Sequence, residues 1–469
     1  MLERETTGDR ESGAAHREEI AMNNHLLCYA LALAATTALV TPAVSADLTM
    51  TCRCVIGGVN DAEAQWITKD VIPDFTAANS GINVTLKQFA GEDAALAQQE
   101  ALDFSTSAGA DVAGFDGFLI PSFVDGGLLK PLDEVAGKDV DSWEGWSHIS
   151  DGSKAIMSYQ GKAYGLALGT DVRMIFTRKD LLAKAGLPAD WQPKSWDDLL
   201  GAARALKKAD PNSFPLQLDA GVNMGEATTM QGYYMALLGT GESVRDDSGK
   251  WIVSSPAILD TLKLYKTIYV DEKLGDQRAQ LLADGRNQTF ANFRDGKTAL
   301  LVEGDWFYRA VTAPGSEYAV ADRDNVMGWA KMPAEQPGKG FNGQDFVTIS
   351  GGDGFVLNPH TKDPVDAWAL LAFMNGKDEL TKLQSLEEGI RIRDDVPVMQ
   401  SPFLTAIAKA LLPLTTARPN DGNYDKVSSA IQQMTESVVS GDASPEDAMA
   451  TFKTTVTGIV GADNTVSKS

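Results

Sequence analysis

The sequence predicts an α/β protein built of two lobes, and three observations lead to this prediction. Short apolar strands alternate with helical stretches from residue 47 onward, and such alternation is typical of a sheet with helices on both faces. The chain has 469 residues, 43% of them hydrophobic, which is enough for two domains of ordinary size. No low-complexity linker or repeat interrupts the pattern, so we expect the lobes to be packed together or joined by short segments.

The first strands and helices follow from Asp47 in regular order. The stretch LTMTCRCVI alternates polar and apolar residues, as a strand does. The next stretch carries Trp66, Val71 and Phe75 at helical spacing and stops at Gly81. A second strand (INVTLKQFA), a second helix (EDAALAQQEALDFSTS) and a third strand (DVAGFDGFLI) continue the alternation. Ligands of such sheets bind beyond the carboxyl ends of the strands.

The middle of the chain repeats this organisation. SWDDLLGAARALKKAD predicts a helix capped by Ser195, with carboxylates in its first turn and lysines in its last. A tight turn, a strand and a helix opened by Ser255 and Pro256 follow in DDSGKWIVSSPAILDTLKLYKTIYV. FRDGKTALLVEGDW is a charged turn and an apolar run that ends in Gly-Asp-Trp. A strand with only a core role does not need that ending.

The N-terminal segment predicts export. Leu26 begins an apolar stretch of about 15 residues, and TPAVSA follows with Val44 and Ala46 at the −3 and −1 positions of a signal cleavage site. The stretch is shorter than the ~20 residues that span a membrane. We therefore assign residues 1–46 to an upstream extension plus a signal peptide cleaved near Ala46, with Met22 as the true start. The expected location is the periplasm.

Composition limits the possible partners and cofactors. The net charge of −23 argues against nucleic acid, whose phosphates need a basic footprint. After processing, only Cys52 and Cys54 remain, and both a strained disulfide and a pair of buried free thiols stay open. His148 and His360 lack the spacing of metal ligands. We therefore predict neither a metal nor a cofactor.

No catalytic motif is present, but polar and aromatic residues gather at predicted strand ends. The sequence has no G-x-S-x-G elbow, phosphate loop or H-E-x-x-H, so we predict that the protein is not an enzyme. Aromatic faces suit the C–H face of a sugar, and carboxylates accept from its hydroxyls. An exported carbohydrate-active enzyme remains the alternative. The strand-end residues are Phe115, Asp116, Asp171, Arg173, Asp305 and Trp306.

Six segments in a fixed order resemble the family 1 extracellular solute-binding proteins of ABC transporters, the group that includes maltodextrin-binding proteins. The resemblance runs from about Asp47 to Gly461. Its most specific part is YQGKAYGLALGTDVRMIFTRKDLLAKAGL followed by PKSWDDLLGAARALK. The other segments are ADVAGFDGFLIPSFVDGGLLKPLDE, FRDGKTALLVEGDW, GGDGFVLN, GIRIRDDV and ARPNDGNYDKVSSAIQQMTESVVSGDASPEDAM.

The resemblance implies a periplasmic-binding-protein (Venus flytrap) fold, in which two lobes, each a sheet flanked by helices, are joined by crossing hinge segments. Lobe one would comprise residues 47–167 and 332–375, and lobe two residues 168–331 and 376–469. The crossings would lie near YGLALGT, GWAKMP and MNGKDE. A monomer would bind a carbohydrate in the cleft, close, and deliver it to the transmembrane subunits of an ABC permease with a separate ATPase. Service to a chemoreceptor is the alternative.

The resemblance also implies which residues bind the ligand. Asp116 takes the place of the acidic hydroxyl-binding residue of lobe one, and Trp306 that of the stacking tryptophan of lobe two. Asp171 occupies a ligand-facing position at the first crossing. The remaining candidates are Asn60, where the chain departs from the family's commoner tryptophan-bearing version, and Asn223, Glu226, Gln231, Gly352, Asp353, Arg391 or Arg393, and Tyr424. The composition favours a neutral sugar, while the arginines leave an anionic sugar open.

Overall fold

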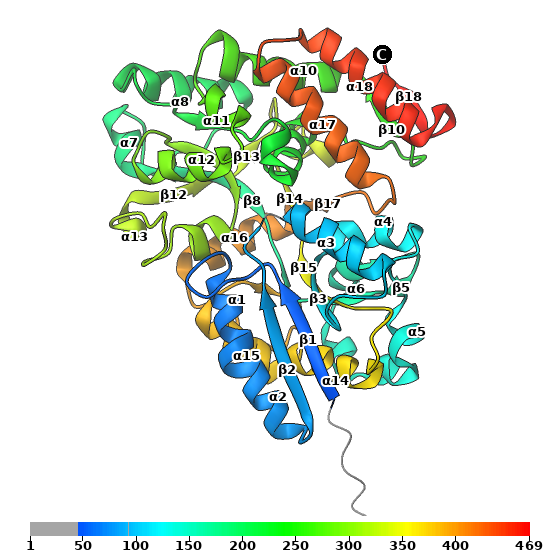
Figure 1. Ribbon diagram of the computed structural model, residues 1–469. Coiled ribbons are helices and arrows are strands. Elements are labelled where there is room, and N and C mark those ends of the chain that lie inside the picture. The colour runs from blue at the N-terminus through cyan, green and yellow to red at the C-terminus, as the bar shows by residue number, and fades with distance from the viewer. Residues whose placement is uncertain (1–45, 92) are drawn as a thin grey trace, which may run out of the picture. The chain divides into compact units, whose positions relative to one another are not determined.

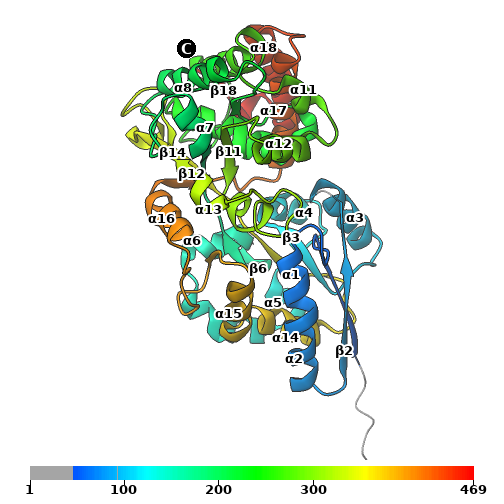
Figure 2. The same ribbon diagram turned by 90° about the vertical axis from the view of Figure 1, so that its left-hand side faces the viewer.

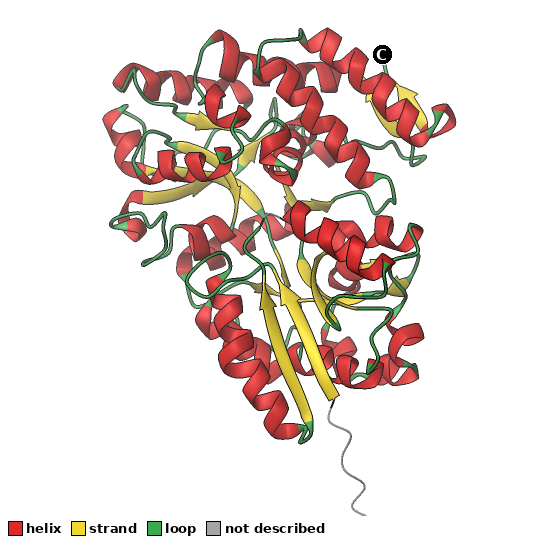
Figure 3. Cartoon of the chain, viewed as in Figure 1, coloured by secondary structure: helices red, strands yellow, loops and turns green. Residues whose placement is uncertain are grey.

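The computed structural model describes residues 46–91 and 93–469. The predicted extension, signal peptide and start at Met22 lie outside these residues. Strand β1 (Ala46–Cys52) begins at the residue after which cleavage is predicted. Secondary structure alternates between helix and strand along the chain, which confirms the predicted α/β class (Figure 3).

A five-stranded sheet forms the first lobe. Its order is β2 (Ile82–Gln88), β1, β3 (Val112–Asp116), β15 (Asp353–Leu357) and β6 (Gly165–Ala167). β1 runs parallel to β2 and β3, whereas β15 is antiparallel to β3 and β6. The expected parallel arrangement therefore holds for the first three strands, and a returning strand completes the sheet.

Helices follow the strands of this lobe as the periodicity predicts. α1 (Asp61–Trp66) and α2 (Ile72–Ala78) continue one another through a π-helical turn, and Trp66, Val71 and Phe75 are all buried. Figure 1 shows this helix beside β1 and β2, with α15 against it. The other helices of the lobe are α3 (Asp93–Ser105), α4 (Ile120–Asp125), α5 (Leu132–Ala136), α6 (Asp151–Lys154), α14 (Pro364–Met374) and α15 (Lys377–Leu386).

A four-stranded sheet forms the second lobe, in the order β12 (Met327–Ala330), β8 (Arg173–Arg178), β11 (Leu300–Gly304) and β9 (Leu216–Gln217). Figure 2 shows β11 and β12 among the helices of this lobe. The helices are α7 (Lys179–Lys184), α8 (Trp196–Ala209), α9 (Tyr234–Gly239), α10 (Pro256–Lys266), α11 (Gln277–Leu281), α12 (Gly285–Arg294), α13 (Arg323–Val326), α16 (Pro402–Leu411), α17 (Tyr424–Val439) and α18 (Pro445–Val460).

The predicted helix caps are present in this lobe. The Ser195 hydroxyl accepts a hydrogen bond from the backbone N–H of Asp198 at 3.2 Å, and the Ser255 hydroxyl accepts one from Ile258 at 3.1 Å. Each bond satisfies one of the amides that a helix start leaves without a partner. Short strands complete the structure: β4 (Ser158–Tyr159), β5 (Lys162–Ala163), β7 (Gly169–Thr170), β10 (Trp251–Ser254), β13 (Met332–Pro333), β14 (Phe346–Ser350), β16 (Ile390–Arg391), β17 (Thr415–Ala417) and β18 (Thr465–Ser467).

The hydrophobic clusters place two of the three crossings elsewhere than expected. Met332, Val347 and Ile349 pack in the cluster of the second lobe, although residues 332–375 were assigned to lobe one. The reason is that β14 pairs with β13 and with β17, so this segment completes a sheet of the second lobe. Conversely, Leu380 and Leu383 of α15 pack in the cluster of the first lobe, although residues 376–469 were assigned to lobe two.

The chain therefore crosses between the lobes near residues 168–172, 350–353 and 396–404. Leu168 still packs in the first lobe and Val172 already packs in the second. The last crossing lies between Val396, in a cluster of the first lobe, and Leu404, in a cluster of the second.

Hydrogen bonds join the first two crossings. The Thr170 hydroxyl donates to the backbone carbonyl of Gly351 at 2.8 Å, and the backbone N–H of Gly351 donates to the Asp171 carboxylate at 2.6 Å. In addition, β7 pairs with β16. The first two crossing segments thus meet at one place, beside the strand ends that form the candidate site.

Candidate ligand-binding cleft

A cleft of about 260 Å³ lies where the crossings meet the ends of β3 and β15, and residues of both lobes line it. Strands point their terminal side chains into it because the carboxyl ends of β1 and β3 lie at the same edge of the sheet. Most of the residues proposed from the sequence come together here. They are Asn60, Phe115, Asp116, Asp171, Arg173, Glu226, Gln231, Trp306, Gly352, Asp353 and Arg391.

Four proposed residues do not line this cleft. Asp305 is buried and holds the end of β11 to the start of β8, because its carboxylate accepts from the backbone N–H of Val172 at 3.3 Å. Asn223 is exposed, and its side-chain amide donates to the carbonyl of Leu281 at 2.9 Å.

The other two are held by charged partners. Arg393 is buried and pairs with Asp395 at 2.9 Å and with Glu144 at 3.2 Å, so its guanidinium faces the first lobe. Tyr424 is buried behind the cleft, where its hydroxyl donates to the Glu226 carboxylate at 2.5 Å. Tyr424 therefore positions a residue that lines the cleft.

Trp306 explains why β11 ends in glycine. A Cβ atom at Gly304 would lie 1.9 Å from the Trp306 ring, closer than any atoms can approach. The absence of a side chain at Gly304 thus allows the indole to fold back over the strand end and line the cleft. The guanidinium carbon of Arg173 lies 4.9 Å from the ring centroid, a distance at which cation and ring attract.

Charged side chains dominate the lining. Carboxylates outnumber guanidinium groups by eight to six, and most of the arginines are ion-paired with them or with nearby carboxylates. Most of these arginines and several of these carboxylates were not predicted from the sequence. The pairs are Arg418 with Asp116 and Glu226, Arg53 with Asp93, Arg173 with Asp171, Arg309 with Glu387 and Asp305, and Arg286 with Glu303.

Arg391 differs from the other arginines of the lining. Among the described residues, no carboxylate lies within 4.0 Å of its guanidinium, which donates instead to the side-chain oxygen of Gln384 at 2.8 Å and to the carbonyl of Glu387. Burial and the neighbouring Arg309 lower the pKa of Arg391 to about 9. A guanidinium group has five N–H donors, more than these two acceptors use, so Arg391 can also donate to a ligand oxygen.

Burial raises the pKa of four carboxyl groups of the lining, those of Glu63, Glu100, Asp116 and Asp353. Glu63 and Asp116 show how large this effect is. Burial, together with the nearby Asp353 carboxylate, raises the pKa of Glu63 to about 8. Burial likewise raises the pKa of Asp116 to about 7, although Arg418 acts in the opposite direction. Each is thus able to donate or accept a hydrogen bond near neutral pH.

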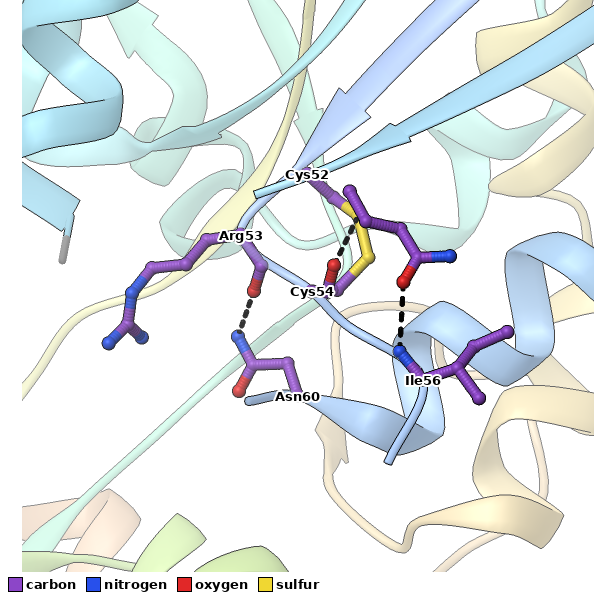
Figure 4. The surroundings of a disulfide bond; sticks show 6 residues. Cys52, Arg53, Cys54, Ile56 and Asn60 are labelled. Carbon is purple, nitrogen blue, oxygen red and sulfur yellow. Dashed lines mark hydrogen bonds between the residues drawn. A yellow bond between two sulfur atoms is a disulfide. The ribbon is translucent and has the colours of Figure 1, made fainter. Parts of the chain in front are cut away.

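A disulfide shapes one rim of the cleft. Cys52 and Cys54 are joined and buried, which decides between the two alternatives left open by the sequence. Figure 4 shows Arg53 between them, with its carbonyl accepting from the Asn60 side chain at 2.8 Å. Arg53 and Asn60 both line the cleft. The disulfide therefore constrains the backbone that presents these two side chains.

Two clusters bring potential metal ligands together in the described part of the chain. In the first, the Cys52 and Cys54 sulfur atoms lie near the Glu63 carboxylate, but these sulfurs are bonded to each other. In the second, at the surface, His148 contacts Asp394 at 2.9 Å. Neither cluster is therefore a preformed metal site, because the sulfurs of the first are bonded to each other and the second lies at the surface. Within residues 46–91 and 93–469, no helix has the length and apolar character needed to cross a membrane.

Comparisons with known proteins agree with this architecture. A candidate binding protein from Brucella abortus (strain 2308) is 24% identical over 384 residues, which is 81% of this chain and 86% of that protein. An ABC transporter solute-binding protein from Thermotoga lettingae TMO, solved with alpha-D-tagatose, has a TM-score of 0.74 at 24% identity and covers 89% of this chain and 100% of its own. The maltose-bound MalE3 of T. maritima has a TM-score of 0.73 at 19% identity, with 88% and 100% covered.

These structures share the two-lobed periplasmic-binding-protein fold with the chain. The model of the family described as bacterial extracellular solute-binding protein matches residues 60–380, a span that includes the four-stranded sheet, every strand of the five-stranded sheet except β1, and most of the cleft. The chain therefore belongs to the bacterial extracellular solute-binding protein family.

Proposed function

We propose that this protein is the substrate-binding component of an ABC importer and that it binds a small neutral sugar or polyol in the cleft between its lobes. The observation that carries the proposal is the composition of the lining: carboxylates and guanidinium groups surround a tryptophan held over a strand end. Carboxylates accept from sugar hydroxyls, guanidinium groups donate to them, and an aromatic face suits the C–H face of a ring.

The charge of the lining supports a neutral ligand over an anionic one. Eight carboxyl groups face six guanidinium groups, so the lining has no large excess of positive charge even where Glu63 and Glu100 keep their protons. Five of the arginines are already paired within the protein, and Arg391 is the sixth, with no carboxylate of the described residues within ion-pair distance. The related structures that hold tagatose and maltose give further support, since both of these sugars are uncharged.

The mechanism is closure around an unaltered ligand. Ligand contacts on both lobes make the closed arrangement more favourable, because a ligand shifts a conformational equilibrium only by its differential affinity. The closed monomer then docks on the transmembrane subunits of the permease, and a separate ATPase supplies the energy. Export to the periplasm, with cleavage near Ala46, brings the protein to this permease. N-terminal sequencing of the secreted protein should give Asp47, and an intact N-terminus would contradict the export step.

A thermal-shift screen tests the binding function. Neutral monosaccharides, disaccharides and polyols are compared with sugar acids and amino acids at equal concentration. We expect a neutral sugar or polyol to raise the melting temperature, with an affinity near micromolar, equivalent to about 8 kcal/mol. Chromatography of the recovered sugar should show it unchanged. Stabilisation by amino acids alone, or cleavage of the sugar, would contradict the proposal.

A further inference from the structure

The Arg418 side chain fills one end of the cleft. It follows β17, and only 9% of the side chain is exposed. Its guanidinium donates to the Asp116 carboxylate at 2.7 Å and to the Glu226 carboxylate at 3.3 Å. Its central carbon lies 4.6 Å from the centroid of the Phe118 ring. One planar cation is thus held by two carboxylates and an aromatic ring, which is a complete binding environment for a guanidinium group.

The partners of Arg418 come from both lobes. Asp116 ends β3 of the first lobe, and Glu226 lies two residues before the buried π-helix Thr228–Tyr233 of the second lobe. The crossing glycine makes room for this bridge, because a Cβ atom at Gly351 would lie 3.0 Å from a terminal nitrogen of Arg418. The bridge is therefore built into the crossing and is not an accidental surface contact.

Glu226 cannot easily turn toward a ligand cation. The Tyr424 hydroxyl donates to one of its oxygens at 2.5 Å, and the Ser428 hydroxyl donates to the other at 2.6 Å. Both donors lie on α17 and hold the carboxylate in place. Asp116 is likewise fixed, since it accepts from the backbone N–H of Phe118 at 3.2 Å. Arg418 thus supplies the positive charge that these two fixed carboxylates require.

We propose that Arg418 is a specificity-determining residue, a built-in cation that reserves this end of the cleft for neutral hydroxyl groups and excludes ligand ammonium groups. The inference rests on the proposed sugar-binding function. A hydroxyl hydrogen-bonds to lone pairs of Asp116 that Arg418 leaves unused, whereas an ammonium group would have to compete with Arg418 for the same charge. Without Arg418, two half-buried carboxylates would lack a cation, which is costly, and a cationic ligand would relieve that cost.

Rescue with free guanidinium tests this assignment without knowledge of the natural ligand. Arg418→Ala opens a space of the shape of the missing group. Millimolar guanidinium chloride, compared with equal sodium chloride, should raise the melting temperature of Arg418→Ala and should not raise that of the wild type. Arg204→Ala is the matched control, because Arg204 pairs with Glu272 at the surface of α8 at 2.6 Å. An equal response of Arg418→Ala and Arg204→Ala would overturn the assignment.

Matched sugar pairs test the specificity itself. Glucose, galactose and mannose are each compared with the 2-amino-2-deoxy analogue, in wild type and in Arg418→Gln, which keeps most of the side-chain volume if Arg418→Ala does not fold. We expect the ratio of amino-sugar to neutral-sugar affinity to rise by about tenfold in Arg418→Gln. The reason is that the Asp116 and Glu226 carboxylates would then lack their cation. An unchanged ratio would overturn the proposal. If the wild type bound no sugar of any kind, the proposed function would fail, while the guanidinium experiment would still decide the role of Arg418.

Discussion

Single side chains explain how a strand end becomes a binding surface. The Trp306 indole lies in the space that a side chain at residue 304 would fill, so the two positions act as one unit. Gly304→Ala should displace the ring and weaken binding of the sugar found in the screen by at least about tenfold, as should Trp306→Ala. Isothermal titration measures both. Because both substitutions act through the same indole ring, the double variant should bind no more weakly than Trp306→Ala alone. Additive losses of affinity would contradict this shared role.

Ionisation of Glu63 makes the stability of the folded protein depend on pH. The pKa of Glu63 is about 8 in the folded protein against an ordinary 4.5, so the folded state holds this proton more tightly than the unfolded state. The resulting stability is complete below the unfolded pKa and is lost as the pH rises through about 8. Glu63→Gln, which cannot ionise, should therefore melt at the same temperature as the wild type below pH 4.5 and roughly 2 °C higher above pH 8.

Calorimetry across this pH range checks the Glu63 prediction. Glu317→Gln serves as the control, because Glu317 lies at the surface outside the cleft. It should show no difference that grows with pH. A constant offset between Glu63→Gln and the wild type at every pH would contradict a role for ionisation at this residue.

Among larger elements, the disulfide at the end of β1 contributes to the cleft more than to global stability. A disulfide that closes so short a loop removes little entropy from the unfolded chain, equivalent to about 1.5 kcal/mol. Cys52→Ser with Cys54→Ser should thus change the melting temperature only slightly. Sugar affinity should fall several-fold, since Arg53 and Asn60 line the cleft and are joined at this rim. Dithiothreitol should reproduce the loss in the wild type and leave the double variant unchanged. Full affinity in that variant would contradict the positioning role.

Elements defined by neighbouring residues were predictable from the sequence. The order from β1 to β3 follows from period-two and helical spacing, and the caps at Ser195 and Ser255 follow from residues three positions away. The lobe boundaries were not predictable in this way. β14 joins the second lobe because Thr348 pairs with Thr415, and no local pattern marks a pairing between such distant residues.

The same reason explains which site residues were missed. Asp116 and Trp306 were predicted as site residues because they follow strands, and the apolar pattern of a strand shows where it ends. Arg418 follows a short strand in a segment with little periodicity, and its partners Asp116 and Glu226 lie 302 and 192 residues away. Tyr424, chosen from the same segment, instead supports Glu226 from behind. Charge pairing between lobes becomes visible only when the fold has brought the residues together.

For the molecule as a whole, the bridge from Arg418 to Asp116 links specificity to closure. This ion pair connects the two lobes directly, and it is largely shielded from solvent on the arginine side, where salt screens charges less than at the surface. It should therefore favour closed arrangements before any ligand arrives. A ligand that adds contacts to both lobes then shifts an equilibrium that is already biased, and needs less differential affinity to complete closure.

Small-angle scattering measures this bias. Ligand-free Asp116→Asn should have a larger radius of gyration than the ligand-free wild type, by roughly 1 Å on a radius of about 22 Å, because the neutral amide cannot pair with Arg418 across the cleft. At saturating sugar the two proteins should converge, since ligand contacts on both lobes replace the missing bridge. Asp197→Asn, in the exposed first turn of α8, changes the net charge equally and should scatter as the wild type does. Identical ligand-free profiles for Asp116→Asn and Asp197→Asn would show that Arg418 acts on the ligand alone and not on the equilibrium between open and closed lobes.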